Sequence, residues 1–280
     1  MKPAKISILA PGLIGGSVAL ASARAFPQSS LFIWSRKQES LAPIQKVLPK
    51  ANTGTDLAAA AGSDLVLLGA PASALAGLVQ PLLPHLSAQT LVTDVASVKE
   101  PVEKELAPLL QGRGRWIGAH PMAGSEDSGF PAARADLFQK ATVILTPTTS
   151  TPAQTTRDAS AFWKSLGARV VELPAGEHDR QVARISHLPH AVAAALVRAA
   201  GQKPIPLAGP GYRDTTRVAA CPAPMWAEIL LGNREELLAG LKEFHAGLQE
   251  LQAALEKRDA AALAKFLDDA AHIRRTLPPS

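Results

Sequence analysis

The sequence predicts an α/β protein in which an N-terminal doubly wound parallel sheet is followed by an all-helical C-terminal domain. Short, continuous apolar runs alternate with Ala/Leu-rich segments through the first half, as in a buried parallel sheet with crossover helices. A glycine-rich turn follows the first of these runs. After about Val171 the strand signals stop and helical patterns continue, which places the start of the second domain there.

The expected elements of the first domain alternate at the spacing of βαβ units, which connects parallel strands through helices. Apolar runs predict strands over residues 6–10, 31–34, 65–69, 91–94, 116–119 and 142–145. Helical composition predicts helices over residues 17–25, 57–61, 72–83 and 102–110. We therefore expect a dinucleotide-binding domain of Rossmann type over residues 1–172 and a helical domain over residues 173–280.

The helical domain is expected to contain helices over residues 177–200 and 225–231, followed by further helix to the end. Asn233 and Glu236 have the spacing of a capping box at the start of this last helical region. Six apolar residues then recur at steps of four and three, namely Leu237, Leu241, Phe244, Leu248, Leu251 and Leu255. Such a seam packs inside the domain or forms a dimer interface, and both interpretations stay open.

Composition and charge exclude several classes of protein. The 280 residues carry a formal charge of +5, but the basic residues are scattered and no long Lys/Arg run indicates nucleic acid. No stretch approaches the roughly 20 apolar residues of a membrane span, and no signal peptide begins the chain, so a cytoplasmic location is expected. Cys221 is the only cysteine, which excludes an internal disulfide.

The glycine-rich turn comes directly after the first strand and opens the first helix, which is the context of a dinucleotide-binding turn. Gly12 would let the backbone approach a pyrophosphate, and Gly15 would allow close contact between helix and strand. Leu13 and Ile14 lie between them and offer free amides at the start of the helix. Ala10 replaces the first glycine of the usual GxGxxG pattern.

The end of the second strand indicates which dinucleotide is bound. An NAD-binding domain usually has Asp or Glu there to bind the ribose hydroxyls. This chain has Ser35, Arg36 and Lys37 instead, and the two cations would pair with a 2′-phosphate. NADP is therefore expected as the preferred cofactor, with NAD possible, while the alternative is that these cations are only surface residues.

His120 follows the strand over residues 116–119, at the edge where open α/β sheets bind their ligands. A histidine accepts a proton near neutral pH, as hydride transfer from an alcohol carbon requires of a neighbouring base. Ser97 also follows a strand end and is expected to orient the imidazole or to contact a nicotinamide. The alternatives are a structural histidine and a helix-capping serine.

Two polar segments fall in the helical domain. His187 and His190 are three residues apart and so share one helix face, but no cysteine or clear carboxylate completes a metal site, and no metal is expected. Arg213, Asp214 and Arg217 form a charged turn. A buried Arg217 would bind a substrate carboxylate in a fork, with Asp214 holding its orientation, whereas the alternative is an internal ion pair.

These segments together resemble the prephenate/arogenate dehydrogenase family of tyrosine biosynthesis, from GLIGGS through DVASVK, HPMAGSE and SHLPH to YRDTTR. The resemblance implies a homodimer formed through C-terminal helices that oxidatively decarboxylates a cyclohexadienyl substrate, either prephenate or arogenate. It implies that His120 is the base for the ring hydroxyl and Ser97 its partner near the nicotinamide. It also implies substrate-binding roles for Arg217, Asp214, His187, His190 and Glu126.

Two other classes remain open at this point. A related Rossmann-plus-helical oxidoreductase acting on a hydroxyacid or imine with NADP would keep the glycine turn, but does not need HPMAGSE and YRDTTR together. A catalytically silent NADP-sensing protein would bind the cofactor and turn over neither cyclohexadienyl acid.

Overall fold

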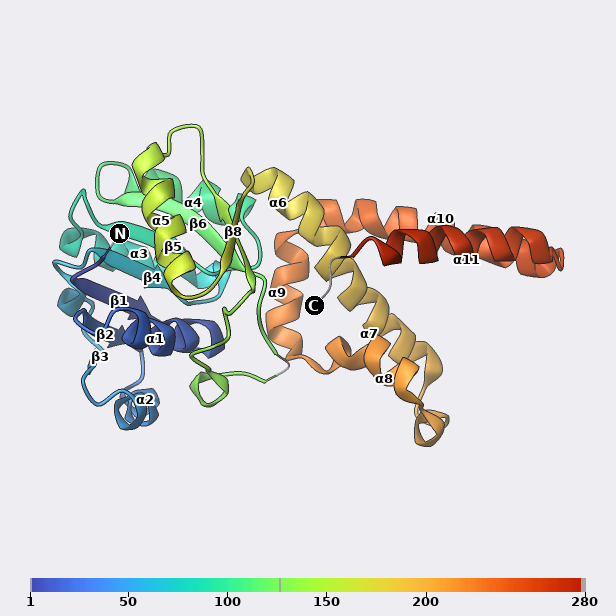
Figure 1. Ribbon diagram of the computed structural model, residues 1–280, viewed down its shortest axis with the longest axis horizontal. Coiled ribbons are helices and arrows are strands. Elements are labelled where there is room, and N and C mark those ends of the chain that lie inside the picture. The colour runs from blue at the N-terminus through green and yellow to red at the C-terminus, as the bar shows by residue number, and fades with distance from the viewer. Residues whose placement is uncertain (1, 126, 278–280) are drawn as a thin grey trace. The chain divides into compact units, whose positions relative to one another are not determined.

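The computed structural model describes residues 2–125 and 127–277 and contains an eight-stranded sheet with the order β3-β2-β1-β4-β5-β6-β7-β8 (Figure 1). The strands from β3 to β6 in that order all pair in parallel, as a doubly wound sheet requires. Their bounds are β1 Lys5–Leu9, β2 Ser30–Trp34, β3 Asn52–Gly54, β4 Leu65–Leu68, β5 Leu91–Asp94, β6 Arg115–Pro121, β7 Thr142–Thr146 and β8 Arg169–Glu172. The predicted fold class is confirmed.

One pairing departs from the predicted parallel sheet. Strand β7 runs antiparallel to β6, with Gly118 opposite Thr146 and Pro121 opposite Val143. The connection between them has only a 3₁₀ turn, Phe130–Ala132, in its described part, whereas a parallel neighbour needs a crossover. Strand β7 therefore begins beside the C-terminal end of β6 and runs back along it. Strand β8 then pairs in parallel with β7 after helix α5.

Helices cover both faces of the sheet (Figure 1). On one face α1 (Leu13–Ala25), α2 (Ala42–Val47) and α5 (Ala153–Ser165) pack on a core that includes Ile8 and Trp163. On the other face α3 (Leu75–Leu82) and α4 (Glu100–Leu110) pack on a core that includes Leu9 and Leu68. Neighbouring residues such as Ile8 and Leu9 enter opposite cores because side chains alternate along a strand.

The predicted helices are mostly present, with shifted ends. The segment expected as a helix over residues 57–61 is a 3₁₀ turn, Leu57–Ala60, in which the Ala58 amide donates to the Asp56 carboxylate. Residues 72–83 contain α3 between two 3₁₀ turns. Such single turns are common connectors, and the sequence pattern does not separate them from short α-helices.

The C-terminal part is helical, as the sequence predicts. It begins with α6 (Ala175–Val182) and α7 (Leu188–Ala200), which a π-helical turn, Ala183–His187, joins into one rod (Figure 1). Then come α8 (Pro210–Thr216), a 3₁₀ turn (Arg217–Ala220), α9 (Ala223–Gly232), α10 (Arg234–Glu256) and α11 (Ala260–Arg275). In the part of the chain that the structure describes, no helix is long and apolar enough to cross a membrane.

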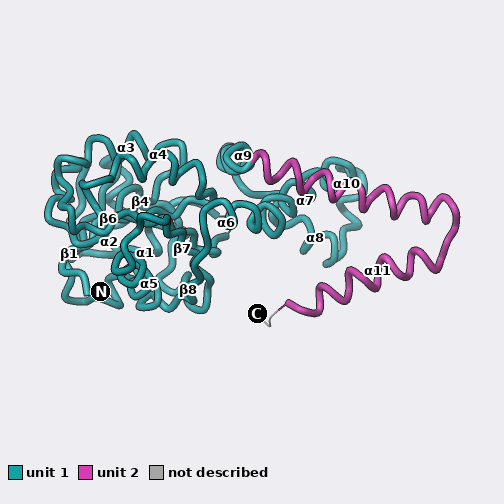
Figure 2. The backbone as a smooth tube through the Cα atoms, turned by 90° about the horizontal axis from the view of Figure 1, so that it is seen from above, with its two compact units in different colours: residues 1–233 teal, residues 234–280 magenta. Residues whose placement is uncertain are grey.

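By compactness the chain divides into residues 1–233 and 234–280, shown in two colours in Figure 2. The second unit consists of α10 and α11, which pack on each other. Its apolar seam is only partly covered, since Leu237 is buried while Phe244, Leu248 and Leu255 are exposed. The domain boundary after residue 172 stays a prediction. The capping box at Asn233 also stays a prediction, and the side-chain amide of Asn233 donates to Asp179 O and contacts His187 Nδ1.

Candidate active site

The glycine-rich turn leaves the N-terminus of α1 open to a ligand. Gly12 precedes the helix, and among the described residues no side chain caps it and no atom would lie within 4 Å of a Cβ at Gly12. A Cβ on Gly15 would lie 2.9 Å from the Ala10 carbonyl oxygen, so only glycine permits this approach of α1 to the strand end. Open backbone and unpaired amides at the positive end of a helix fit a dinucleotide pyrophosphate.

Ala10 keeps the turn geometry although it is not glycine. Its φ of 65° lies in the left-handed region, which costs an L-residue roughly 1–2 kcal/mol. The turn therefore has the backbone shape that the first glycine of the pattern usually provides.

The segment of Ser35, Arg36 and Lys37, here called the basic triplet, lies beside this turn. Parallel pairing sets Leu9 next to Trp34, and the Ala10 amide donates to the Trp34 carbonyl at 3.0 Å. Arg36 and Lys37 are exposed, and the Lys37 ammonium lies 3.9 Å from the carboxylate of Glu39. The cations that the sequence assigns to a 2′-phosphate are thus at the correct edge of the sheet, with one of them partly compensated.

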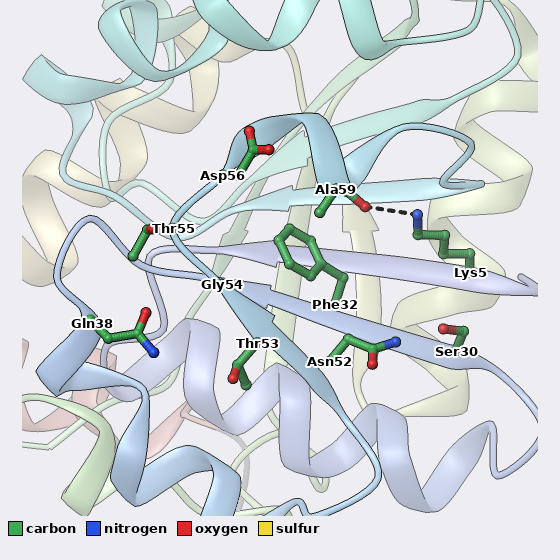
Figure 3. A pocket seen from close by; sticks show the side chains of 10 residues that line it. All are labelled: Lys5, Ser30, Phe32, Gln38, Asn52, Thr53, Gly54, Thr55, Asp56 and Ala59. Carbon is green, nitrogen blue, oxygen red and sulfur yellow. Dashed lines mark hydrogen bonds between the residues drawn. The ribbon is translucent and has the colours of Figure 1, made fainter.

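A cavity of about 530 Å³ opens beside β2 and β3 (Figure 3). Its lining includes Gln38, next in sequence to Lys37, together with Phe32, Gly54 and Thr55. The ammonium of Lys5 at its other end donates to the Ala59 carbonyl at 2.8 Å. The cavity therefore borders the basic triplet but holds none of the predicted catalytic side chains.

His120 lies near the end of β6 and is 7% exposed. Its Nδ1 atom is 2.8 Å from Nε2 of His178 in α6, and the two rings meet edge to face. Burial lowers the pKa of His120 well below its ordinary value of 6.5, and the neighbouring His178 and Lys99 act in the same direction. The imidazole is therefore neutral at physiological pH and can accept a proton.

Ser97 follows β5, the parallel neighbour of β6, so it lies at the same edge of the sheet as His120. Ser97 is half-buried. In the described residues the hydrogen-bond partner of the His120 ring is His178, which the sequence did not single out. The orienting role expected of Ser97 stays a prediction.

A buried ion pair fixes the loop between β5 and α4. The Lys99 ammonium, 1% exposed, bonds to the Asp94 carboxylate and donates to the Ala119 carbonyl at 2.8 Å. The same Asp94 carboxylate accepts from the amides of Ala96 and Ala119. This network ties the loop that carries Ser97 to the residue before His120.

Asp179 is the second residue that sequence reasoning missed. Its carboxylate accepts from the backbone amides of Lys99 at 2.8 Å and Glu100 at 2.9 Å, where α4 begins, and contacts His178 Nδ1 at 2.7 Å. In the sequence, His178 and Asp179 stand among charged residues at a helix start, which is typical of an exposed first turn. The only available signal is their position two turns before His187 on the same helical segment.

His187 and His190 meet at Trp226, as their spacing predicts for one helix face. The His190 ring stacks on the indole with centroids 3.5 Å apart, and His187 meets it edge-on at 6.2 Å. Burial lowers the pKa of both rings, that of His187 to about 4. Nε2 of His187, Nδ1 of His190 and the Trp226 indole nitrogen are buried without a hydrogen-bond partner in the described chain. Buried polar groups of this kind need a partner, which an ordered water or a polar ligand can supply.

The remaining predicted residues lie further along the chain. Arg217 and Asp214 are exposed. Arg217 is not buried, because the short 3₁₀ turn that holds it packs on α7 with Val218 and Ala219 half-buried instead. Glu126 lies outside the described residues. The convergence of Arg217 with His120 on one substrate therefore stays a prediction.

Among residues 2–125 and 127–277, no group of three His, Cys, Asp or Glu side chains is placed to hold a metal ion.

A dinucleotide turn at one strand end and a buried neutral histidine at another define the class of nicotinamide-dependent dehydrogenases. Residues 19–172 match the family model described as prephenate dehydrogenase, nucleotide-binding domain, and residues 174–269 match prephenate dehydrogenase, dimerization domain. The chain belongs to the prephenate dehydrogenase family.

Similar proteins and solved structures point to the same family. The chain is 31% identical over 275 residues to prephenate dehydrogenase of Bacillus subtilis, covering 95% of this chain and 74% of that protein. It is 34% identical over 242 residues to cyclohexadienyl dehydrogenase of Zymomonas mobilis, covering 83% and 82%. Prephenate dehydrogenase from A. aeolicus, solved with hydroxyphenyl propionate and NAD⁺, superimposes with a TM-score of 0.87 at 28% identity over 97% of each chain. Synechocystis arogenate dehydrogenase gives 0.82 at 30%, over 97% of this chain and 99% of that one.

Proposed function

We propose that this protein catalyses the oxidative decarboxylation of prephenate or arogenate in tyrosine biosynthesis, with NADP as the preferred cofactor. The observation that carries the proposal is the buried, neutral His120 at the strand edge that also holds the glycine turn. Both family models together span residues 19–269, so the match includes the helical region in which one ring nitrogen of His187 and one of His190 lack a hydrogen-bond partner among the described residues.

The proposed chemistry assigns one proton transfer to His120. The ring hydroxyl gives its proton to the imidazole while its carbon loses a hydride, for which a bound nicotinamide is the acceptor. The ring carboxylate then leaves as carbon dioxide, its electron pair makes the ring aromatic, and the phenolate takes a proton back. Gly12 and Gly15 would hold the cofactor through the backbone, and Ser97 would contact its nicotinamide end.

Substrate binding is assigned to the helical region. Arg217 would pair with the ring carboxylate, and its main contribution would be to position the diacid for hydride loss. Asp214 would orient Arg217, and Glu126 would stand at the pocket entrance. The unsatisfied ring nitrogens of His187 and His190 support a polar group of the substrate between α7 and α9.

The preference for NADP rests on charge beside the glycine turn. Arg36 and Lys37 follow the end of β2, the position at which NAD-binding domains usually carry a carboxylate. Glu39, 3.9 Å from the Lys37 ammonium, weakens the contribution of that lysine, so Arg36 is expected to carry most of the preference. A. aeolicus prephenate dehydrogenase was solved with NAD⁺, so NAD is kept as the alternative cofactor in this proposal.

A homodimer formed through the C-terminal helices is part of the proposal. In α10 and α11 the apolar residues Phe244, Leu248, Leu255 and Leu267 are exposed on the single chain, and a monomer rarely exposes such a run. The second family model is that of a dimerization domain. No nucleic acid or membrane partner is proposed, and the cytoplasmic location stays an expectation from the sequence.

The deciding experiment is a steady-state assay that crosses prephenate and arogenate with NADP and NAD. We expect turnover of at least one substrate, and a higher kcat/KM with NADP than with NAD. Turnover of neither acid despite cofactor binding would instead support a silent NADP sensor. Turnover only of unrelated hydroxyacids or imines would support the other oxidoreductase class.

A further inference from the structure

We infer that His178 and Asp179 fix the tautomer of His120 and leave its Nε2 atom as the one that accepts the substrate proton. The inference rests on the proposed function, because it concerns the base of that reaction. It is carried by a continuous chain of hydrogen bonds, from Asp179 Oδ1 to His178 Nδ1 at 2.7 Å and from His178 Nε2 to His120 Nδ1 at 2.8 Å. All three side chains are buried.

The direction of these hydrogen bonds follows from Asp179. One of its carboxylate oxygens accepts from the Lys99 amide and the other from the Glu100 amide, and backbone amides can only donate. Both oxygens therefore act as acceptors. The atom that faces Asp179 Oδ1, Nδ1 of His178, must consequently carry a hydrogen.

The tautomer of His120 is the next consequence. A neutral His178 with hydrogen on Nδ1 has a lone pair on Nε2, which can only accept. His120 must then donate from Nδ1, and its own lone pair lies on Nε2. The opposite tautomer of His120 would set two lone pairs against each other at 2.8 Å.

Several titratable groups face the pair from the surrounding elements. The groups that face it are Lys99 from the segment before α4, Asp94 from β5, Asp179 from α6 and His187 from the π-helical turn. The buried ammonium of Lys99 disfavours a second cation on His120 before substrate arrives. When His120 takes a proton, the Asp179 carboxylate, reached through His178, stabilises the resulting imidazolium.

Asp179 is also well suited to hold this chain still. The same carboxylate caps the N-terminus of α4, and α4 is packed into the core through Leu106 and Val102. The Asp179 carboxylate therefore cannot rotate without breaking its hydrogen bonds to this helix. His178 and Asp179 are therefore positioning residues that act through His120.

The first test uses Asp179→Asn, His178→Leu and His178→Gln in the full-length protein. We expect Asp179→Asn and His178→Leu to lower kcat about 10²–10⁴-fold with little change in KM for cofactor. His178→Gln returns an acceptor to His120 and should recover at least about tenfold over His178→Leu. The acid limb of the kcat profile should shift in the first two variants. Asp158→Asn, which breaks the 2.6 Å ion pair with Arg115 at the far side of α5, is the matched control and should keep kcat.

The second test reads the tautomer without turnover. In protein labelled with ¹⁵N-histidine, two-bond ¹⁵N–¹H correlations at pH 7.5 should show His120 with hydrogen on Nδ1, assigned by loss of the signal in His120→Asn. Hydrogen on Nε2 would overturn the inference, as would wild-type kcat in His178→Leu or equal kcat in the Leu and Gln variants. Because this measurement needs no substrate, it separates a wrong tautomer from a wrong reaction, and it decides the matter if the variants do not fold.

Discussion

The glycine turn and the His120–His178 pair both belong to the ligand-binding side of one sheet, yet they are built in different ways. The turn uses backbone amides and a few neighbouring residues, and its cations, Arg36 and Lys37, are exposed. The histidine pair joins buried side chains that are 58 residues apart. The difference teaches that a single side-chain substitution should affect cofactor binding less than it affects proton transfer, which depends on each buried contact.

The sharpest test of this contrast is His120→Asn. Asparagine keeps a hydrogen-bonding side chain of similar size but has no basic nitrogen, so kcat should fall about 10²–10⁴-fold. The dissociation constant for NADP, measured by fluorescence titration, should stay within about twofold. Unchanged turnover would remove His120 from the mechanism.

The next largest effect is expected from Lys99→Met, which leaves the buried Asp94 carboxylate without its counter-charge. Breaking such a pair costs about 3–5 kcal/mol of unfolding free energy, measured by urea denaturation. The control is Lys104→Met, which removes the exposed 2.9 Å pair with Glu100 and should cost less than about 1 kcal/mol. Equal stability of the two variants would show that the buried network contributes nothing.

Stability should also fall on acidification. The folded protein keeps His187 neutral down to a pKa of about 4, whereas an unfolded chain binds a proton below about 6.5. The contribution of His187 to the free energy of unfolding is therefore complete above pH 6.5. It is lost as the pH falls towards 4, and the total loss is up to about 3 kcal/mol. The lowered pKa of His120 acts in the same direction. Urea midpoints from pH 7.5 to 4.5 should show a smaller slope in His187→Asn than in wild type, and an unchanged slope in His245→Gln.

A smaller effect is expected at the cofactor edge. Arg36→Asp replaces the cation beside the turn by a carboxylate that repels a 2′-phosphate, so the kcat/KM ratio of NADP to NAD should drop about 10- to 100-fold. Lys50→Asp makes the same change of charge before β3, at the opposite edge of the sheet, and should leave the ratio unchanged. A constant ratio in Arg36→Asp would remove this residue from cofactor selection.

The smallest effect is predicted for Ala10→Gly. Relief of the left-handed conformation offsets the added freedom of the unfolded chain, for a net gain of about 0.5 kcal/mol. Thermal unfolding should move up by a few degrees at most, with the NADP dissociation constant unchanged. A loss of more than about 1 kcal/mol would show that the Ala10 methyl group packs usefully.

Much of the sheet was predictable because buried parallel strands are continuous apolar runs, as β1 and β4 show. Strand β3 was not, since Asn52–Gly54 is short and polar and becomes a strand only through pairing with β2. Strand β7 was predicted over residues 142–145, but its antiparallel direction was not. Strand direction depends on the path of residues 122–141, which hydrophobic periodicity does not encode.

The candidate site divides in the same way. Gly12, Gly15 and His120 could be proposed from the sequence because their expected roles depend on local context, a strand end followed by a turn. His178 and Asp179 were not, because their partners are supplied by β6 and by the start of α4, far away in sequence. Local patterns identify residues whose function depends on the backbone next to them, and they miss those whose function comes from packing.

The π-helical turn Ala183–His187 has a consequence for how this region tolerates insertions and deletions. A π-helical turn holds one residue more than an α-helical turn, and each residue advances an α-helix by roughly 100°. Deleting one residue there would restore a regular helix and rotate His190 away from its indole partner, although every side chain of the site would remain in the sequence. A change of length in this short stretch should therefore disturb the site more than a substitution of an exposed residue such as Ile185.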